Sequence, residues 1–323
     1  MKAICVDPDT LEISWQEVPD PKPKEGEVVI DIHASAINRA DLLQRAGNYP
    51  VPPGASTYMG LEAAGVISEL SEGVTDWQVG DRVCTLLGGG GYAERVATPA
   101  SLLIRIPEDW DFEKAAAVPE AFYTAYLNLF IEGELKEGET VLIHGGASGV
   151  GTAGIQMAKR AGCRVLVTAG RPNKCKYCKE LGADVAVNYK EDDFESAIRQ
   201  VSPDGVDVIL DITAAAYLKP NINLLRTRGR LVIIALLTGA KAEINLAQLM
   251  RDRKRVIGSV LRPRSLEEKI EIHDRFENRF WPDLLSGAIQ PIIYKTVPIE
   301  ETEAAQNILT NNENIGKVIL KVR

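Results

Sequence analysis

The 323-residue sequence predicts an α/β protein with two domains, an all-β barrel and a doubly wound parallel sheet. Three observations predict this class. Residues 1–119 consist mainly of short alternating runs separated by Pro and Gly. From Gly138 onward, apolar runs of strand length alternate with helical segments. One of these runs, Thr140–His144, leads into a glycine-rich turn. The predicted domains are 1–119, completed by 262–323, and 120–261.

The barrel strands are expected where apolar and polar residues alternate, with prolines 19, 21 and 23 between the first of them. Gly80-Asp81 is expected to form a hairpin turn, and Asn38–Ala46 a short helix. The final run, Lys317–Val322, is expected to return to the barrel. The other expected strands are Lys2–Val6, Leu11–Glu17, Glu27–Ser35, Leu61–Leu70, Asp81–Leu87 and Tyr92–Val96.

Six apolar runs predict the parallel sheet, because right-handed crossovers between them give a doubly wound arrangement. The expected strands are Thr140–His144, Arg164–Thr168, Val185–Asn188, Val206–Asp211, Gly229–Ala235 and Arg255–Ser259. Helices are expected at Phe112–Val118 and Phe122–Leu129 before the sheet and at Glu267–Leu285 after it. Asn173–Leu181 and Phe194–Gln200 are expected to be helices within it.

The turn after the first of these strands has the spacing Gly146-x-x-Gly149-x-Gly151, a relative of G-x-G-x-x-G. Glycines let backbone N–H groups approach a pyrophosphate, and the following helix directs its positive end there. The alternative is that the glycines only make a tight corner. The strand, turn and helix context favours a dinucleotide site.

The segment after the second strand indicates which dinucleotide is bound. An acidic residue normally binds the adenosine ribose at this place. The sequence instead has Ala169-Gly170-Arg171-Pro172-Asn173-Lys174, with two cations and no carboxylate. A 2′-phosphate is a strong acceptor for such cations, so NADPH is predicted over NADH. The alternative is that Arg171 and Lys174 begin a solvated helix face.

Composition limits the possible partners. A net charge of −8 and a pI near 5.2 disfavour nucleic acids and anionic membranes as partners. No apolar run is long enough to span a bilayer, and no signal peptide is recognisable, which predicts a cytoplasmic location. Five scattered cysteines predict no disulfide framework, and three separated histidines form no set with metal-ligand spacing. No metal site is predicted.

Together with these features, several motifs are similar to those of the medium-chain dehydrogenase/reductase superfamily, over the whole length of the chain. The sequence most resembles the zinc-free NADPH quinone oxidoreductases, and within them the tumour-suppressor-inducible branch, where Ser148 fits better than the Gly of crystallin-type relatives. The motifs that carry the resemblance are 38–42 (NRADL), 53–56 (PGAS), 60–65 (GLEAAG), Gly80-Asp81, 115–120 (AAAVPE), 144–156, Asn188-Tyr189 and 314–317 (NIGK).

The resemblance implies a GroES-like catalytic domain and a Rossmann domain with an enclosed cleft between them. It implies that Ser148, Gly149, Val150 and Gly151 contact the pyrophosphate, and that Lys174 and Tyr189 contact the 2′-phosphate side. The alternative for Tyr189 is an aromatic cover of the core. Ala235, Leu236, Leu237, Val260 and Leu261 would frame the nicotinamide, with Tyr49 beside it. Zinc alcohol dehydrogenases have Cys near the position of Arg39 and His at that of Leu61, so a catalytic zinc is not expected.

A quinone accepts hydride with little acid–base help, so the predicted function is an NADPH-dependent quinone reductase with direct hydride transfer. Tyr49 and Asn38 are the predicted polar groups for the quinone oxygen, with water as the final proton source. Asn38 is equally well placed as a helix N-cap. The alternatives are an enone or enal reductase and a non-catalytic NADPH- or RNA-binding protein. A homodimer is expected, with Gly229–Ala235 as the edge strand that joins two sheets.

Overall fold

A computed structural model describes all residues, 1–323, and the chain divides into two compact units. Unit 1 contains residues 1–123, 262–285 and 291–323, and unit 2 contains 124–261 and 286–290. The first boundary between the units lies within helix α3, four residues beyond the predicted position.

Unit 1 is built on a seven-stranded, mostly antiparallel sheet with the order β14-β15-β3-β4-β5-β7, and β6 also pairs with β3. A separate hairpin pairs β1 with β2. The strands are β1 (Lys2–Val6), β2 (Ile13–Glu17), β3 (Glu27–Ala36), β4 (Glu62–Leu70), β5 (Arg82–Leu86), β6 (Arg95–Pro99), β7 (Leu103–Arg105), β14 (Ile293–Pro298) and β15 (Lys317–Lys321).

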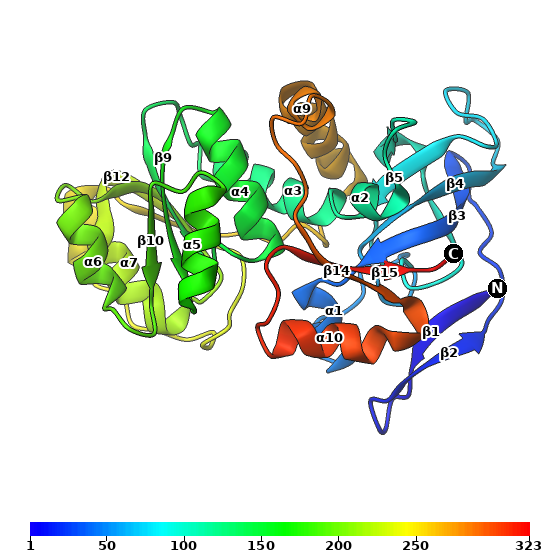
Figure 1. Cartoon of the computed structure of the whole chain (residues 1–323), viewed down its shortest axis with the longest axis horizontal. Coiled ribbons are helices and arrows are strands. Elements are labelled where there is room, and N and C mark those ends of the chain that lie inside the picture. Colours follow the sequence, from blue (N-terminus) through cyan, green and yellow to red (C-terminus); the bar gives the residue numbers. More distant parts are fainter. The chain divides into compact units, whose positions relative to one another are not determined.

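The expected return of the last strand is confirmed, since β15 pairs with β3 from Ile319 opposite Ala36 to Lys321 opposite Ala34 (Figure 1). The predicted strand Tyr92–Val96 is wrong at its start. Tyr92 and Ala93 are buried through loop contacts, including the bond from the Tyr92 N–H to Met59 O, and the strand begins at Arg95.

The helices of unit 1 are α1 (Arg39–Arg45), α2 (Phe112–Ala116), α3 (Pro119–Tyr126), which continues into unit 2, α9 (Leu266–Leu285) and α10 (Thr302–Thr310). Helix α9 has the predicted amphipathic pattern, and its apolar face buries Ile272, Phe276 and Phe280. Phe276 lies 5.1 Å, centroid to centroid, from the ring of Tyr123.

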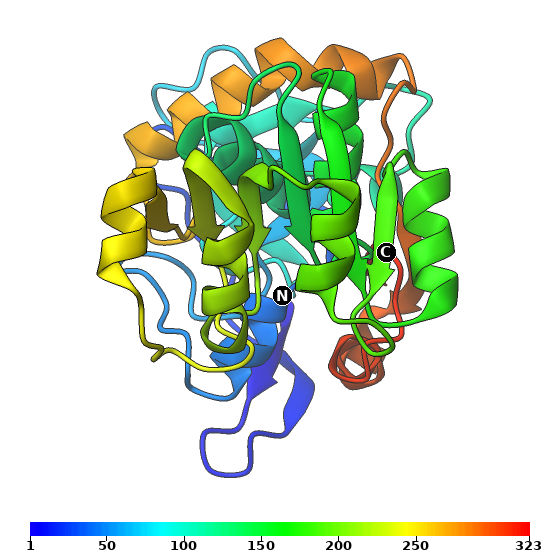
Figure 2. The same ribbon diagram turned by 90° about the vertical axis from the view of Figure 1, so that its left-hand side faces the viewer.

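Unit 2 is a six-stranded parallel sheet with the order β10-β9-β8-β11-β12-β13, whose strands run in one direction in Figure 2. The strands are β8 (Thr140–His144), β9 (Arg164–Ala169), β10 (Val185–Asn188), β11 (Val206–Asp211), β12 (Leu225–Ile233) and β13 (Arg255–Gly258). The strand order reverses between β8 and β11, which is where ligands bind in sheets of this kind. The predicted doubly wound sheet is confirmed.

The predicted edge strand Gly229–Ala235 is wrong. Its residues form the end of β12 and the turn after it, and β12 pairs with β11 on one side and β13 on the other. The edges of the sheet are β10 and β13. The expected homodimer stays a prediction, and β12 has no unpaired backbone edge with which to form it.

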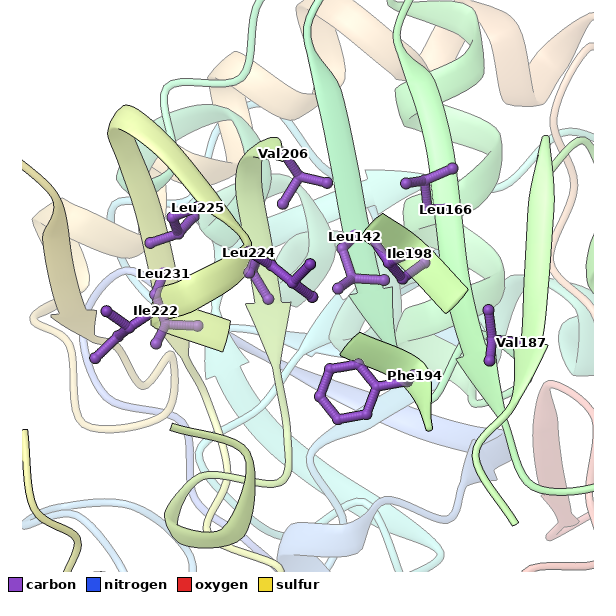
Figure 3. Packing of buried hydrophobic residues seen from close by; sticks show 11 residues of the cluster. Leu142, Leu166, Val187, Phe194, Ile198, Val206, Ile222, Leu224, Leu225 and Leu231 are labelled. Atoms are coloured by element: carbon purple, nitrogen blue, oxygen red, sulfur yellow. The ribbon is translucent and has the colours of Figure 1, made fainter. Parts of the chain in front are cut away.

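Helices α4 (Gly149–Arg160), α5 (Pro172–Glu180), α6 (Phe194–Val201), α7 (Leu218–Leu224) and α8 (Leu246–Asp252), with a π-helical turn at Leu127–Glu132, complete unit 2. On one face of the sheet, Leu142, Leu166 and Val187 pack against Phe194 and Ile198 of α6 (Figure 3). Leu and Ile side chains of α7 extend this core, which fixes the sheet and therefore the positions at which its strands end.

No helix of the chain is both long enough and apolar enough to cross a membrane.

Candidate functional site

The predicted cofactor-binding residues of unit 2 gather at one edge of its sheet. They follow the carboxyl ends of β8, β9, β10, β12 and β13. Because these strands are parallel and in register, with His144 opposite Thr168 and Ala169 opposite Asn188, the segments that follow them lie side by side. The sheet thus brings residues from separate turns to the one edge along which the resemblance implies that NADPH lies.

The glycines of the turn after β8 are required for different structural reasons. Gly145 has φ +70°, in the left-handed region that favours glycine. A Cβ on Gly146 would lie 2.7 Å from Cβ of Val167 on β9. A Cβ on Gly151 would lie 2.3 Å from the carbonyl oxygen of Gly145. The turn therefore needs glycine for close packing of helix α4 on the strands as well as for the sharp change of direction.

Two backbone amides at the start of α4 are available to a ligand. Ser148 is the N-cap, and its Oγ accepts from the Gly151 N–H at 3.0 Å. The N–H of Ser148 donates to Gly145 O, and that of Gly146 to Thr168 O. The N–H groups of Gly149 and Val150 make no such bond, as expected for the first helical residues, and both residues are half-buried. An anion there would meet two amides and the positive helix end.

The predicted 2′-phosphate corner forms where β9 and β10 end. Gly170 follows β9 and Tyr189 follows β10, and a Cβ on Gly170 would lie 2.6 Å from the Tyr189 hydroxyl. Arg171 is exposed, whereas Lys174 is only 3% exposed. Burial, followed by the charge of Arg171, lowers the pKa of Lys174 to about 8. Lys174 therefore does not begin a solvated helix face.

The segments predicted to frame the nicotinamide follow β12 and β13, whose last residues, Ile233 and Gly258, are opposite each other. Leu236, Leu237 and Val260 are about half exposed, at 56%, 53% and 47%, while Leu261 is buried and Ala235 half-buried. The loop after β12 is tied to the one after β11, because the Leu237 N–H donates to Ile212 O and the Thr238 N–H to Thr213 O.

A buried polar network at the same edge was missed from the sequence. The carboxylate of Asp211 accepts from the N–H groups of Thr213 and Ala214 and from Asn221 Nδ2. Asn221 Oδ1 lies 2.8 Å from Nε2 of His144, whose Nδ1 lies 2.9 Å from Thr168 Oγ1. Burial lowers the pKa of His144, so the ring is neutral and has a structural role.

Unit 1 contains a second polar cluster, which joins three neighbouring strands. Asn38 follows β3, Glu62 begins β4 and Lys317 begins β15. Lys317 Nζ donates to Glu62 Oε1 at 2.7 Å, to Asn38 Oδ1 at 2.5 Å and to the carbonyl of Ile37 at 3.1 Å. Glu62 is fully buried and Lys317 is 4% exposed. All three ammonium protons therefore have acceptors inside the protein.

Asn38 occupies the N-cap position of α1, but its side chain turns toward this pair. Its Nδ2 donates to Glu62 Oε1 at 2.8 Å and to Ala36 O at 3.3 Å. Both amide protons are thus used inside unit 1. The start of α1 is instead stabilised by Asp41 in its first turn, whose carboxylate accepts from the Asn38 backbone N–H at 2.7 Å.

Two further carboxyl groups of this cluster have raised pKa values. Asp41 is buried and accepts from the Tyr92 hydroxyl at 2.8 Å, and burial raises its pKa to about 6. Burial, with the charge of Glu62 second, raises the pKa of Glu120 to about 8, so this carboxyl group is largely protonated at neutral pH. The Glu120 backbone N–H donates to Glu62 Oε2 at 2.9 Å.

Tyr49 lies on the irregular segment between α1 and β4, and its hydroxyl makes no hydrogen bond to the protein. Burial raises the pKa of Tyr49, so the phenol stays a donor. The guanidinium carbon of Arg262 lies 5.2 Å from the centroid of the Tyr49 ring. The geometry therefore distinguishes the two predicted catalytic residues: Tyr49 has a free O–H, and Asn38 has no free N–H. No group of three or more His, Cys, Asp or Glu side chains could hold a metal ion.

Known proteins resemble this chain over nearly its whole length. Residues 24–108 match the alcohol dehydrogenase GroES-like domain, and residues 149–275 match the zinc-binding dehydrogenase family. The quinone oxidoreductase of Rattus norvegicus is 31% identical over 316 residues, which cover 97% of this chain and 94% of that protein. The synaptic vesicle membrane protein VAT-1 homolog of the same organism is 30% identical over 328 residues, covering 97% of this chain and 81% of that protein.

Solved structures show the same fold. The quinone oxidoreductase of Escherichia coli complexed with NADPH superposes with a TM-score of 0.89 at 27% identity, covering 99% of both chains. The CurK enoyl reductase superposes with a TM-score of 0.86 at 26% identity, covering 100% of this chain and 99% of the other. With its GroES-like and Rossmann domains, this chain belongs to the zinc-free quinone oxidoreductases of the medium-chain dehydrogenase/reductase superfamily.

Proposed function

We propose that the protein is an NADPH-dependent quinone reductase that transfers hydride directly from the nicotinamide to a quinone. The observation that carries the proposal is the arrangement of donors. Unit 2 offers two unpaired amides and two cations at one sheet edge, and unit 1 offers an unpaired hydroxyl beside a buried guanidinium. The quinone oxidoreductases among the relatives support the choice of acceptor.

NADPH would supply the hydride when bound. The residues that would hold it are Gly149 and Val150 for the pyrophosphate, with Gly146, Ser148 and Gly151 shaping the turn, and Arg171, Lys174 and Tyr189 around Gly170 for the 2′-phosphate. The segments Ala235–Leu237 and Val260–Leu261 would frame the nicotinamide. The buried Lys174 beside Arg171 suits a dianionic partner, because an anion would offset the repulsion by which Arg171 lowers the pKa of Lys174.

In unit 1, Tyr49 would donate its hydroxyl proton as a hydrogen bond to the quinone oxygen, where negative charge develops. Asn38 would have only an indirect role, by helping to hold Glu62 and Lys317 in place. Its amide protons already bond to Glu62 Oε1 and Ala36 O, so they cannot bind the quinone. Water would deliver the final proton. Membership of the tumour-suppressor-inducible branch remains part of the proposal.

A second candidate, reduction of enones or enals, is favoured by one observation. Such a reaction must protonate carbon and so needs an acid, and the Glu120 carboxyl group, with a pKa of about 8, is protonated at neutral pH. The enoyl reductase among the similar structures supports this candidate.

The experiment that tests the function is a panel of acceptors with NADPH oxidation as the readout. We expect 1,2-naphthoquinone to be reduced with a kcat/KM at least about tenfold above that of a simple enone. The reverse order would make the protein an enone reductase. Tight NADPH binding with no turnover of either acceptor would indicate a non-catalytic binding protein, and a filter-binding assay at low and high salt would test RNA as its partner.

The cationic corner predicts a measurable cofactor preference. We expect Arg171→Ala and Lys174→Ala each to weaken NADPH binding by about tenfold, the cost of one charge-assisted hydrogen bond of about 1.5 kcal/mol, and to leave NADH binding unchanged. Because a bound phosphate favours the charged form of Lys174, NADPH affinity should fall as pH rises above about 8 in the wild type but not in Lys174→Ala. Fluorescence titrations with both cofactors check this. An unchanged preference in both variants would contradict the assignment.

The two predicted catalytic residues should behave differently. Tyr49→Phe is expected to lower the single-turnover rate of quinone reduction by about 10- to 100-fold, with little change in stability, because its hydroxyl has no protein partner. Asn38→Ala is expected to destabilise unit 1 by about 1–3 kcal/mol, since it removes a partner from both Glu62 and Lys317. Stopped-flow kinetics and urea unfolding separate the two effects. Unchanged rates in both variants would remove any chemical role for either residue.

A further inference from the structure

Arg262 is a buried cation whose position is fixed by two hydrogen bonds within unit 1. Only 3% of the residue is exposed. Its Nε donates to the carbonyl of Gly88 at 2.9 Å, and its Nη2 donates to Gln44 Oε1 at 2.7 Å. These bonds come from two different segments and hold the guanidinium plane in one orientation over the ring of Tyr49.

The third nitrogen of this side chain, Nη1, is buried and has no hydrogen-bond partner. Leaving a buried donor of a charged group unpaired costs free energy, and few buried donors in native proteins lack a partner. Only two other buried side-chain atoms lack a partner, the acceptor Asn128 Oδ1 and the donor Arg226 Nε. Arg226 is nevertheless paired through another nitrogen with Asp207 at 2.8 Å. Arg262 has no carboxylate at ion-pair distance, so both its charge and its Nη1 protons are uncompensated.

The neighbourhood shows which kind of group fits Nη1. The guanidinium lies against the ring of Tyr49, whose hydroxyl is also unpaired, so this neighbourhood holds two hydrogen-bond donors without partners. The side chains of Asp41 and Glu120 act on Arg262 only at longer range. A pair of donors beside a fixed cation is suited to an oxygen atom that carries negative charge.

We propose that Arg262 Nη1 and the Tyr49 hydroxyl together bind the acceptor oxygen on which negative charge develops during hydride transfer. This inference rests on the proposed quinone reductase function. The hydride leaves the nicotinamide with its electron pair, so NADPH is oxidised to NADP+. It bonds to one quinone oxygen, and the second oxygen becomes an anion that the guanidinium stabilises without itself giving up a proton. Water then gives this anion a proton and leaves as hydroxide, and the reduced product is the hydroquinone.

In this proposal, the acceptor reaches the buried Nη1 by displacing the ring of Tyr49, against which the guanidinium lies. Tyr49 belongs to residues 46–61, which contain neither helix nor strand, and no side-chain hydrogen bond holds its ring. A flat quinone could therefore push the ring aside at low cost and lie against the guanidinium. The Tyr49 hydroxyl would still donate a hydrogen bond to the acceptor oxygen. Arg262 cannot follow, because Gly88 and Gln44 anchor it. It therefore acts as the fixed member of the pair.

The first test is binding of a phenolate anion, which needs no turnover. With 4-nitrophenolate as the probe, we expect the wild type to bind at least about tenfold more tightly than it binds uncharged 4-nitroanisole. Arg262→Met should lose this preference and Arg262→Lys should keep part of it. Arg264→Met is the matched control, since it removes a cation two residues away that pairs with Glu268 at 3.2 Å. Equal binding of both probes by the wild type would overturn the proposal.

The second test is the single-turnover rate of quinone reduction. We expect about a 100-fold loss in Arg262→Met at unchanged NADPH affinity, and partial recovery of Arg262→Ala by added guanidinium ion but not by sodium at the same concentration. A fall in NADPH affinity at an unchanged rate would assign Arg262 to the cofactor, and a lowered Tm alone would make it structural; either result overturns the proposal. If the wild type reduces no quinone but discriminates between the two probes, the proposed function fails while the anion site stands.

Discussion

Replacing Lys317 by methionine is expected to destabilise the protein by about 3–5 kcal/mol. The ammonium group of Lys317 is the counter-charge of Glu62, which is fully buried and starts the neighbouring part of the sheet. Without it, the Glu62 carboxylate keeps only the Asn38 amide and the Glu120 backbone N–H as donors. A buried charge held by two neutral donors costs far more than the same group paired with a cation. Urea unfolding monitored by tryptophan fluorescence measures the loss.

Lys321→Met is the matched control on the same strand. Lys321 is 55% exposed and pairs with Glu113 at 3.3 Å, so its replacement should change stability by less than about 1 kcal/mol. The double variant Lys317→Met with Glu62→Gln should recover much of the loss, because a neutral amide needs no counter-charge. If the losses of the two single variants simply add in the double variant, Lys317 and Glu62 do not act as a pair and the prediction is wrong.

Replacing Gly151 by alanine should have the second large effect, on both stability and cofactor binding. The added Cβ would meet the carbonyl oxygen of Gly145 at 2.3 Å and Gly146 C at 2.7 Å, and both contacts are with backbone that has no rotamer to change. Helix α4 must therefore move away from the turn. We expect a loss of about 3 kcal/mol in the free energy of unfolding. We also expect at least about a tenfold loss of NADPH affinity, because the Gly149 and Val150 amides would move with the helix.

Gly154→Ala tests whether the position rather than the residue type matters. Gly154 lies in the same helix, and its Cβ would be tight only against the ends of two side chains, Ile143 Cδ1 at 3.2 Å and Leu129 Cδ1 at 3.3 Å, with Ala125 Cβ at an ordinary 3.9 Å. These can shift by a few tenths of an ångström, and alanine favours the helix by about 1 kcal/mol over glycine. We expect nearly unchanged stability and NADPH affinity. Calorimetry and cofactor titration measure both variants. Equal losses of stability and of NADPH affinity in Gly151→Ala and Gly154→Ala would contradict the argument.

The parallel sheet could be predicted in detail from the sequence because burial on both faces gives its strands continuous apolar runs. Val141, Leu142 and Ile143 are all fully buried, and the limits of β8, β10 and β11 agree with the prediction. The glycine turn and the cations after β9 could also be predicted. Each of these motifs consists of residues that are close together in the sequence and directly follow one strand of the parallel sheet.

The structural features that could not be predicted from the sequence depend on contacts between residues that are far apart in the chain. Strand β14 is exposed along most of its length, with only Val297 buried, so it has neither an alternating nor an apolar pattern. The edge of the parallel sheet was misassigned because the more apolar β12 looked suited to an interface, whereas the edge strand β13 is mostly exposed. Nothing in the sequence near Lys317 or Arg262 indicates that these cations are buried, since each is enclosed by segments more than 170 residues away.

The pairing of β15 with β3 has a consequence for the order of events during synthesis. Residues 124–261 are contiguous, so unit 2 can fold as soon as that stretch has left the ribosome, apart from a five-residue segment that joins it later. Unit 1 has to wait for residues 291–323 before β3 gains its last neighbour and Glu62 gains its ammonium partner. Until residues 291–323 have been synthesised, the sheet of unit 1 carries an open edge and a buried acid without its cation. This interval is when chaperone binding and aggregation are most to be expected.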